Sequence, residues 1–425
     1  MKSIIFLILL ITFSVLNTGM NQTNSSILDN LFKDRRYFEF RKAFELRTDD
    51  LSESGKQYYF ALMECIFNKP RSSNKRIDYL LQNNNSELTD SMKVILLKSK
   101  IVNCVNLFDY IEANEESSRL VNNYKSLIEP DEIEETINST LIWDACKNLE
   151  KQTIEKSGDS KLPVKRDIAG LVNIEVNVND VSEHFIFDTG ANFSTISEST
   201  AGKMNLIFLE NKIKVGSFTG SKVDSRLAYA AEMTIGNMKV KNVLFLVMPD
   251  EALTFGGGIY VINGIIGFPV IKEMQEIHLT SNEIFIPEKA GESGFANLGF
   301  DGFTPVIETL VNSDTLVFTF DTGAKHTTLY YEYYRKNKTV IDSMYEPVEI
   351  KTGGAGGEVK IPGFNLKDVK FEISSKEKII DKVSLFSKII KDNDKYLHGN
   401  LGSDFINSFS KMKINFISMF VEFEN

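Results

Sequence analysis

Two aspartates stand in nearly the same local sequence, far apart in the chain. Asp188 lies within residues 185–196 and Asp321 within residues 318–329, and seven of the twelve aligned positions are identical. If these segments pack together, the two carboxylates cannot both ionise easily, so one pKa falls and the other rises. Such a pair holds one proton as a unit. Its ionised member can accept a proton from water while the protonated member donates to a carbonyl oxygen.

A second repeated motif follows each aspartate, in residues 263–268 and 398–403. Gly267 follows Asp188 by 79 residues and Gly402 follows Asp321 by 81, while the two aspartates are 133 residues apart. Two motifs that keep nearly one spacing indicate a fold that occurs twice in the chain. Two copies can pack about a pseudo-two-fold axis, which would bring the carboxylates side by side.

Each aspartate lies between an apolar segment and a Thr-Gly pair. The apolar segment, read as a strand, would carry the carboxylate from a packed interior to a loop. Gly190 and Gly323 allow close backbone approach and unusual φ angles. Thr189 and Thr322 can form hydrogen bonds to the other copy. This chemistry needs no metal and no cysteine or serine nucleophile.

Over residues 168–425 the sequence resembles the aspartic protease clan that contains retropepsins and pepsins. The Asp-Thr-Gly-Ala form of both motifs is similar to retropepsins. So are the glycine elements 265–267 and 400–402, which in that family pack beside the catalytic loop. The resemblance implies a single-chain, two-lobed enzyme, pepsin-like in layout and retropepsin-like in each lobe. Asn400 and Phe268 depart from the usual residues at their positions, which concerns local packing more than catalysis.

The resemblance also implies a set of site residues, with Asp188 and Asp321 as the catalytic pair. The active-site loops contain Thr189, Gly190, Ala191, Thr322, Gly323 and Ala324. The supporting glycine elements contain Ile266, Gly267, Leu401 and Gly402. Family members carry a β-hairpin flap over the cleft, and the candidate flap residues are Gly216, Gly220, Gly353 and Gly357. Alternatively, these glycines belong to two ordinary hairpin turns, which would have the same glycine-rich composition.

His326 is interpreted as a solvated loop residue. The alternative is that it tunes the pKa values of the aspartate pair.

Composition narrows the function classes. The 425 residues suggest two to three domains. The net charge of −10, without a dense basic run, makes nucleic acid an unexpected partner. Cys65, Cys104 and Cys146 form neither a disulfide framework nor a metal pair, and we interpret them as buried, reduced thiols. The four His residues include no HExxH motif, so neither a metal nor another cofactor is predicted.

The elements that must position the aspartates divide into two kinds. Residues 27–156 place apolar side chains at helical spacing, and turn-forming clusters divide them into about six helices that resemble a TPR-like array. Residues 157–167 are polar and predict a linker. From residue 168 the apolar period changes to two, which predicts lobes at 168–290 and 295–425. The predicted fold is multidomain α+β, with an N-terminal α-helical domain followed by an all-β, two-lobed fold with pseudo-two-fold symmetry.

The N-terminus predicts export. Lys2 precedes an apolar run over residues 4–16. This run is shorter than the stretch of about 20 residues that a membrane span needs. A basic residue followed by a short apolar run is typical of a signal peptide, here predicted over residues 1–20. Export would lead to the periplasm, the cell surface or the medium. The alternative is an uncleaved N-terminal anchor, and no other membrane contact is expected.

These observations favour an exported aspartic endopeptidase that acts on protein or peptide substrates. One alternative is a non-catalytic exported module that binds proteins or peptides and retains the fold. Another is a scaffold in which the helical array carries the function. The helical domain would bind a protein partner or, alternatively, act as a zymogen segment.

Overall fold

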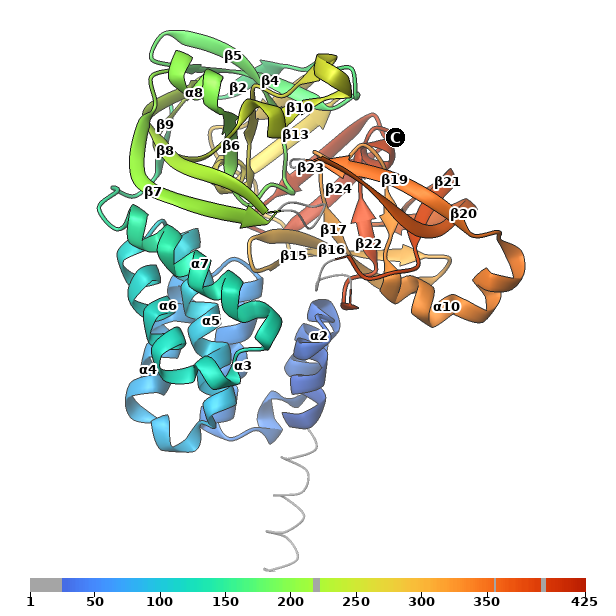
Figure 1. Cartoon of the computed structure of the whole chain (residues 1–425). Coiled ribbons are helices and arrows are strands. Elements are labelled where there is room, and N and C mark those ends of the chain that lie inside the picture. Colours follow the sequence, from blue (N-terminus) through green and yellow to red (C-terminus); the bar gives the residue numbers. More distant parts are fainter. Residues whose placement is uncertain (1–24, 217–221, 355–356, 391–394) are drawn as a thin grey trace, which may run out of the picture.

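The computed structural model describes residues 25–216, 222–354, 357–390 and 395–425. A helical region over residues 25–146 is followed by β-rich lobes, which confirms the predicted α+β multidomain organisation (Figure 1). The predicted signal peptide lies outside the described residues. Within those ranges, every helix is too short or too polar to cross a membrane.

The helical region consists of short helices joined by tight turns. After the helical residues 25–33, its α-helices are α2 (Tyr37–Arg47), α3 (Glu53–Ile66), α4 (Pro70–Asn83), α5 (Asp90–Asn106), α6 (Tyr110–Tyr124) and α7 (Pro130–Cys146). The side chains of Ser52, Thr89 and Asp109 accept backbone N–H groups at the starts of α3, α5 and α6, which satisfies donors that a helix leaves free. From α3 onward, consecutive helices pack against each other. Membership of the TPR class stays a prediction.

The three cysteines are free thiols. Cys104 and Cys146 are buried and Cys65 is partly buried. Burial raises the pKa of the Cys65 and Cys146 thiols to about 12 and also raises that of Cys104, so all three stay protonated at neutral pH.

Each lobe is built on a mixed sheet. The first sheet has the order β1-β9-β6-β12-β5-β4-β8-β7, and the second has the order β15-β16-β17-β22-β18-β21-β20-β19. The strands of the first are β1 (Thr153–Lys156), β3 (Lys165–Arg166), β4 (Val172–Val178), β5 (Val181–Phe187), β6 (Ser194–Ser197), β7 (Ile207–Gly216), β8 (Lys222–Ile235), β9 (Met238–Met248) and β12 (Gly264–Ile266). The strands of the second are β15 (Leu298–Asp301), β16 (Thr304–Val311), β17 (Asp314–Phe320), β18 (Thr328–Leu329), β19 (Val348–Gly354), β20 (Gly357–Ile373), β21 (Lys376–Phe386) and β22 (Gly399–Leu401).

Short elements complete the lobes. A separate hairpin is formed by β10 (Thr254–Phe255) and β11 (Tyr260–Val261). The α-helices are α8 (Glu198–Lys203), α9 (Phe268–Ile271), α10 (Tyr331–Met344) and α11 (Ser403–Ile406). A five-stranded sheet joins the lobes and consists of β2 (Ser160–Pro163), β14 (Glu283–Ile286), β13 (Glu276–Thr280), β23 (Lys411–Asn415) and β24 (Phe420–Glu424).

The two lobe sheets share one pairing pattern around their short central strands. In the first, β12 is parallel to β5 and antiparallel to β6. In the second, β22 is parallel to β17 and antiparallel to β18. The duplicated motifs therefore lie in equivalent local surroundings, while a two-fold axis relating whole lobes stays a prediction.

The segment predicted as a linker, 157–167, differs from that expectation. It contains β2 and β3, which pair with β14 and β4. The preceding β1, placed in the helical domain by the sequence, pairs with β9. These strands are short and polar: in β2 only Ser160 and Leu162 are buried. Four residues with two buried side chains give too little periodicity to recognise from sequence.

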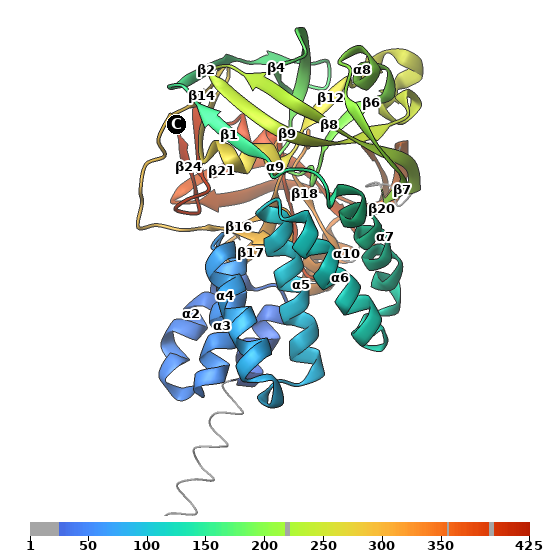
Figure 2. The same ribbon diagram turned by 90° about the vertical axis from the view of Figure 1, so that its left-hand side faces the viewer.

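The helical region contacts both lobes (Figure 2). Toward the second lobe, Arg35 pairs with Asp301, which also accepts the Tyr37 hydroxyl at 2.7 Å. Toward the first lobe, the buried Lys272 ammonium donates to the Asn106 carbonyl at 2.8 Å. The helices therefore form an interface with each lobe, and these interfaces include buried polar groups.

We predict that Asp301→Ala lowers the free energy of unfolding by about 2 kcal/mol, because it leaves the mostly buried Arg35 guanidinium without this counter-ion. Glu308→Ala is the matched control. Glu308 also pairs with the helical region, but its partner, Lys42, is mostly exposed, so its loss should cost less than about 1 kcal/mol. Urea denaturation of both variants checks this, and equal losses would contradict it.

Candidate active site

Asp188 and Asp321 occupy equivalent places at the ends of buried strands. Phe187 at the end of β5 and Phe320 at the end of β17 are fully buried, so each strand is anchored in its core. The Asp188 N–H donates to the Ile266 carbonyl at 3.0 Å, and the Asp321 N–H donates to the Leu401 carbonyl at 3.1 Å. The apolar strand and the glycine element thus hold each aspartate where its strand opens into a loop.

The two aspartate loops face each other. A Cβ added at Gly190 would overlap the Asp321 carboxylate, and one added at Gly323 would overlap the Asp188 carboxylate. Each carboxylate therefore lies against the backbone of the opposite loop, in space that only glycine leaves free. The structure brings together the two residues that the sequence singles out, although they are 133 positions apart.

Buried threonines tie the loops together crosswise. The Thr189 N–H donates to the Thr322 hydroxyl oxygen at 3.1 Å, and the Thr322 N–H donates to that of Thr189 at 3.0 Å. The Thr189 hydroxyl donates to the Phe320 carbonyl at 2.8 Å, and that of Thr322 donates to the Phe187 carbonyl at 2.7 Å. These reciprocal hydrogen bonds fix the two loops relative to each other.

Each carboxylate also accepts backbone donors from its own loop. The Asp188 Oδ1 accepts the Gly190 and Ala191 N–H groups at 2.8 and 3.1 Å. The Asp321 Oδ1 accepts those of Gly323 and Ala324 at 2.8 and 3.0 Å. One oxygen of each carboxylate is thereby oriented, and the groups are positioned before any ligand binds.

Burial is the main cause that raises the pKa of Asp188 well above its usual range. The neighbouring Asp321 carboxylate adds to the rise, while the backbone donors of Gly190 and Ala191 oppose it. The groups of the second loop nearest in sequence, Lys325 and His326, are exposed. This electrostatic arrangement favours a pair that retains a proton at pH values where an isolated aspartate is ionised.

The predicted glycine elements pack directly on the aspartate loops. A Cβ at Gly267 would overlap the Phe193 carbonyl, and one at Gly402 would overlap that of His326. The Gly267 and Gly402 N–H groups donate at 3.1 Å to the hydroxyls of Ser194 and Thr327. These contacts explain the spacing between each aspartate and its downstream glycine.

The two unusual residues of these elements are accommodated by their surroundings. The Asn400 side chain accepts the Thr319 hydroxyl, so its polar group is satisfied. Phe268 is buried and packs edge-on against Phe300 and Phe416. Both departures thus affect packing around the loops and leave the aspartates in place.

Asp404 is a site residue that the sequence did not single out. It accepts the N–H and hydroxyl of Thr327 at 2.8 and 2.6 Å, and its Oδ2 lies 3.5 Å from the His326 Nδ1. Burial raises the pKa of Asp404, but the hydrogen bonds from His326 and Thr327 outweigh burial and lower the pKa below its usual value. The Asp404 carboxyl therefore stays ionised. His326 is exposed, as the reading as a solvated loop residue predicts. Pro269 stands at the position equivalent to Asp404, so the duplication gave no signal for it.

Three of the four candidate flap residues, Gly216, Gly353 and Gly357, belong to two hairpins that extend from the lobes toward the region between them (Figure 1). Gly216 ends β7 and pairs with Lys222 of β8, whereas Gly220 lies outside the described residues. Gly353 lies in β19, and Gly357 begins β20 and pairs with Gly354. The structure places one hairpin between the two motifs of each repeat. Their action as a lid stays a prediction.

Within the ranges that the structure describes, His, Cys, Asp and Glu side chains do not form a group of three or more that could hold a metal ion.

Comparison with known families adds evidence for the first lobe. Residues 174–270 match the family described as aspartyl protease. This range contains Asp188 and Gly267, whereas the Asp321 repeat lies outside it. A search of curated proteins finds no match. The first lobe is therefore similar to retropepsin-like aspartic protease domains, and this similarity covers less than half of the chain.

Proposed function

We propose that this protein is an aspartic endopeptidase in which Asp188 and Asp321 activate a water molecule for attack on a peptide carbonyl. One observation carries the proposal: each carboxylate lies against the glycine of the opposite loop, within the crosswise threonine hydrogen bonds. The aspartyl protease match over the first lobe supports the same reaction class.

The reaction follows from a pair that shares one proton. The ionised carboxylate accepts a proton from water as the water oxygen bonds to the carbonyl carbon, and the protonated carboxyl donates its proton to the carbonyl oxygen. The pair then donates a proton to the amide nitrogen and accepts one from a hydroxyl of the tetrahedral intermediate, so the C–N bond breaks and a carboxylic acid and an amine are released. The pair ends with one proton, ready for another cycle.

An extended peptide is the substrate that this architecture suits. It would bind between the lobes and pair through its backbone with the strands of the flap hairpins. Export of the chain is part of the same proposal and is supported by the apolar N-terminal run.

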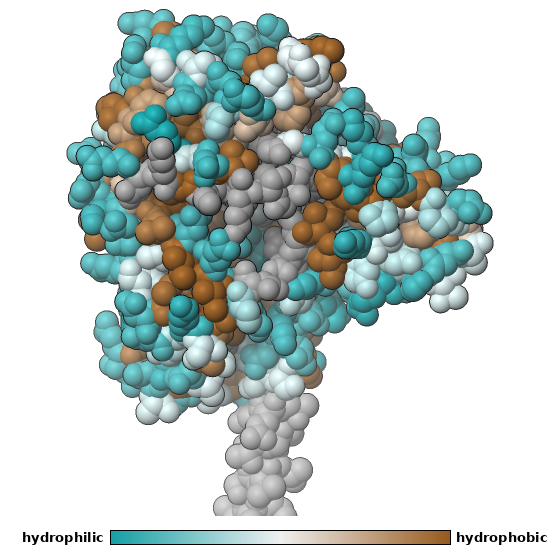
Figure 3. Space-filling model, in the orientation of Figure 1, coloured by the Kyte–Doolittle hydropathy of each residue, from teal (hydrophilic) through white to brown (hydrophobic). Residues whose placement is uncertain are grey.

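The helical region suits a contact with a protein partner. Apolar side chains gather on the surface over α7, where Ile137 and Leu141 are exposed (Figure 3). The alternative zymogen role has less support, because the segment between the helices and the first lobe contains β1 and β2, which pair with β9 and β14.

A binding module that retains the fold is the second candidate. Mutual burial of two acidic groups is unfavourable unless a proton is shared, and a module that only binds peptides gains nothing from it. Substitution of the aspartates separates the two functions, because binding would survive the loss of the carboxylates.

We predict that Asp188→Asn and Asp321→Asn each lower peptide cleavage on the order of a thousandfold, because either change removes one of the two groups that move protons. Mass spectrometry of a peptide library treated with the full chain at pH 3 to 8 measures this.

Asp180→Asn is the matched control. It makes the same chemical change at an exposed turn residue with positive φ, a conformation that asparagine tolerates. It should cleave as the parent does. Because the pair acts as a unit, the double variant should be no worse than either single variant. Cleavage that persists in either single variant would exclude this pair as the active site.

We also predict that Asp188→Asn stabilises the protein relative to the parent, and that the gain increases with pH. The folded-state pKa of Asp188 is raised. The contribution of Asp188 to the free energy of unfolding is therefore complete below the pKa of an unfolded aspartate, about 3.9. This contribution is lost as pH rises through the folded-state pKa. Asparagine has no such loss. Thermal unfolding from pH 3 to 8 tests this, and a pH-independent difference in Tm would refute it.

A further inference from the structure

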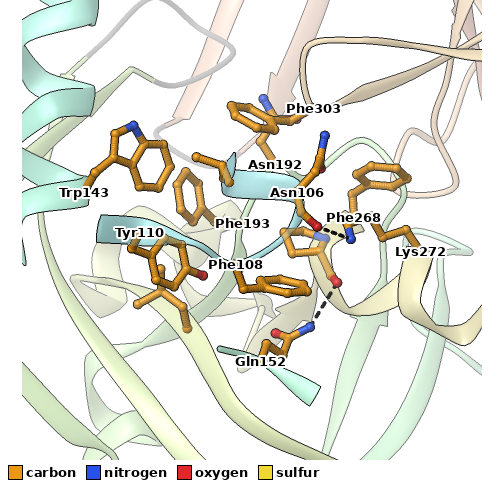
Figure 4. Close-up of a pocket in the computed structure, with 13 residues that line it drawn as sticks. Asn106, Phe108, Tyr110, Trp143, Gln152, Asn192, Phe193, Phe268, Lys272 and Phe303 are labelled. Atoms are coloured by element: carbon orange, nitrogen blue, oxygen red, sulfur yellow. Dashed lines mark hydrogen bonds between the residues drawn. The ribbon is translucent and has the colours of Figure 1, made fainter. Parts of the chain in front are cut away.

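Three parts of the molecule meet beside the Asp188 loop. A cavity of about 20 Å³, the size of a single water molecule, lies among residues of the helical region and of both lobes (Figure 4). Trp143 of α7, Phe193 of the first lobe and Phe303 of the second lobe line it. The helical region therefore reaches the immediate neighbourhood of one aspartate.

Trp143 is the centre of an aromatic cluster at this meeting point. Its side chain is 2% exposed. It stacks on Tyr110 at 6.0 Å with an angle of 8°, and on Phe193 at 6.0 Å with an angle of 25°. Phe303 meets it edge-on at 6.4 Å. Its indole N–H has no hydrogen-bond partner among the described residues, so ring packing is what the tryptophan supplies here.

The contact continues from Phe193 to the carboxylate. Phe193 follows Asp188 by five residues, and its carbonyl packs on Gly267. The Phe268 N–H donates to the Ala191 carbonyl at 2.8 Å, and the Ala191 N–H donates to the Asp188 Oδ1 at 3.1 Å. A shift of the Phe193 ring would therefore be transmitted through a short, hydrogen-bonded loop to the aspartate.

The equivalent position in the second repeat shows the difference that the helical region makes. His326 follows Asp321 by five residues, as Phe193 follows Asp188. The His326 side chain is 68% exposed, whereas Phe193 packs under Trp143. One repeat has an apolar residue where the helices cover the loop, and the other has a polar residue where the loop faces solvent.

The same helix also braces the first hairpin. Ile142 and Trp143 share an apolar cluster with Ile213 of β7 and Leu227 of β8. Helix α7 thus contacts both the loop that follows Asp188 and the two strands of the hairpin proposed to cover the cleft.

We propose that Trp143 is a positioning residue that holds the Asp188 loop, so that the helical region is a permanent part of the active unit and not a segment to be removed. The proposal rests on the proposed protease function for its kinetic consequences. Its geometry rests on the ring contacts and on the asymmetry between Phe193 and His326.

The test compares Trp143→Leu and Trp143→Phe with the control Phe44→Leu in the full chain. Phe44 is equally buried, but its ring contacts are to Phe40, Tyr59 and Phe60, within the helical region. Peptide cleavage is followed from pH 3 to 8, with kcat and KM measured separately, and thermal unfolding reports on stability.

We expect Trp143→Leu to lower kcat by about 10- to 100-fold with little change in KM, because misplacement of reacting groups affects the chemical step. The alkaline limb of its pH profile should move to lower pH, since a looser loop hydrates Asp188. Trp143→Phe should lose less activity than Trp143→Leu, because it keeps an aromatic ring that can stack on Phe193, and its smaller ring costs only part of the packing. Phe44→Leu should lower Tm and leave the alkaline limb of the pH profile at the same pH as in the parent. An unchanged limb in Trp143→Leu, or an equal shift in Phe44→Leu, would overturn the proposal.

Phe193→Leu provides a second route if Trp143→Leu does not fold. It should reproduce the loss of kcat and the shifted alkaline limb of the pH profile, because it removes the ring on which Trp143 stacks. An unchanged alkaline limb in Phe193→Leu would overturn the proposal.

A readout without turnover separates this proposal from the protease function. Carbon-13 NMR of aspartate carboxyls, with the Asp188 signal assigned by its absence in Asp188→Asn, gives the titration midpoint directly. If the parent cleaves no peptide, the proposed function fails, but Trp143→Leu or Phe193→Leu should still bring the Asp188 midpoint closer to that of an ordinary aspartate. A midpoint equal to the parent's would overturn the positioning role in either case.

Discussion

The mutual burial of Asp188 and Asp321 is the constraint on which the rest of the structure depends. Two acidic groups in partly buried surroundings repel each other unless one keeps a proton, so the protein must hold them together against their own charge. The threonine hydroxyls do this through donors and acceptors that cross between loops. The glycines then leave room for each carboxylate against the opposite backbone. Strand ends, glycine elements and helices all serve to keep these contacts in register.

Much of this site could be predicted from the sequence because the duplication compares the chain with itself. Asp188 and Asp321, with their threonines and glycines, are recognisable as paired motifs, and their close approach follows from packing two like units. The downstream glycines were predictable for the same reason. Asp404 was not, because its counterpart is Pro269 and repetition offers no comparison there.

The parts that escaped prediction depend on contacts between unlike segments. Trp143 looked like one more apolar residue on a helical stripe, and no pattern within α7 shows that its ring lies on Phe193, 50 residues later. The short strands β2 and β3 are polar, and they are recognisable only beside β14 and β4, their partners in the sheets. Periodicity reports which face of an element is buried, but it does not report what buries that face.

The sheet that joins the lobes also has a consequence for the order in which the molecule is made. β13 of the first lobe pairs along its length with β23, whose residues 411–415 lie near the end of the chain. Asp188, the helical region and most of the first lobe are synthesised long before Asp321 and Gly402. During translation the nascent chain carries a single aspartate loop and an unfinished sheet. The site needs both carboxylates, so it cannot assemble until Asp321 and the last strands have emerged from the ribosome.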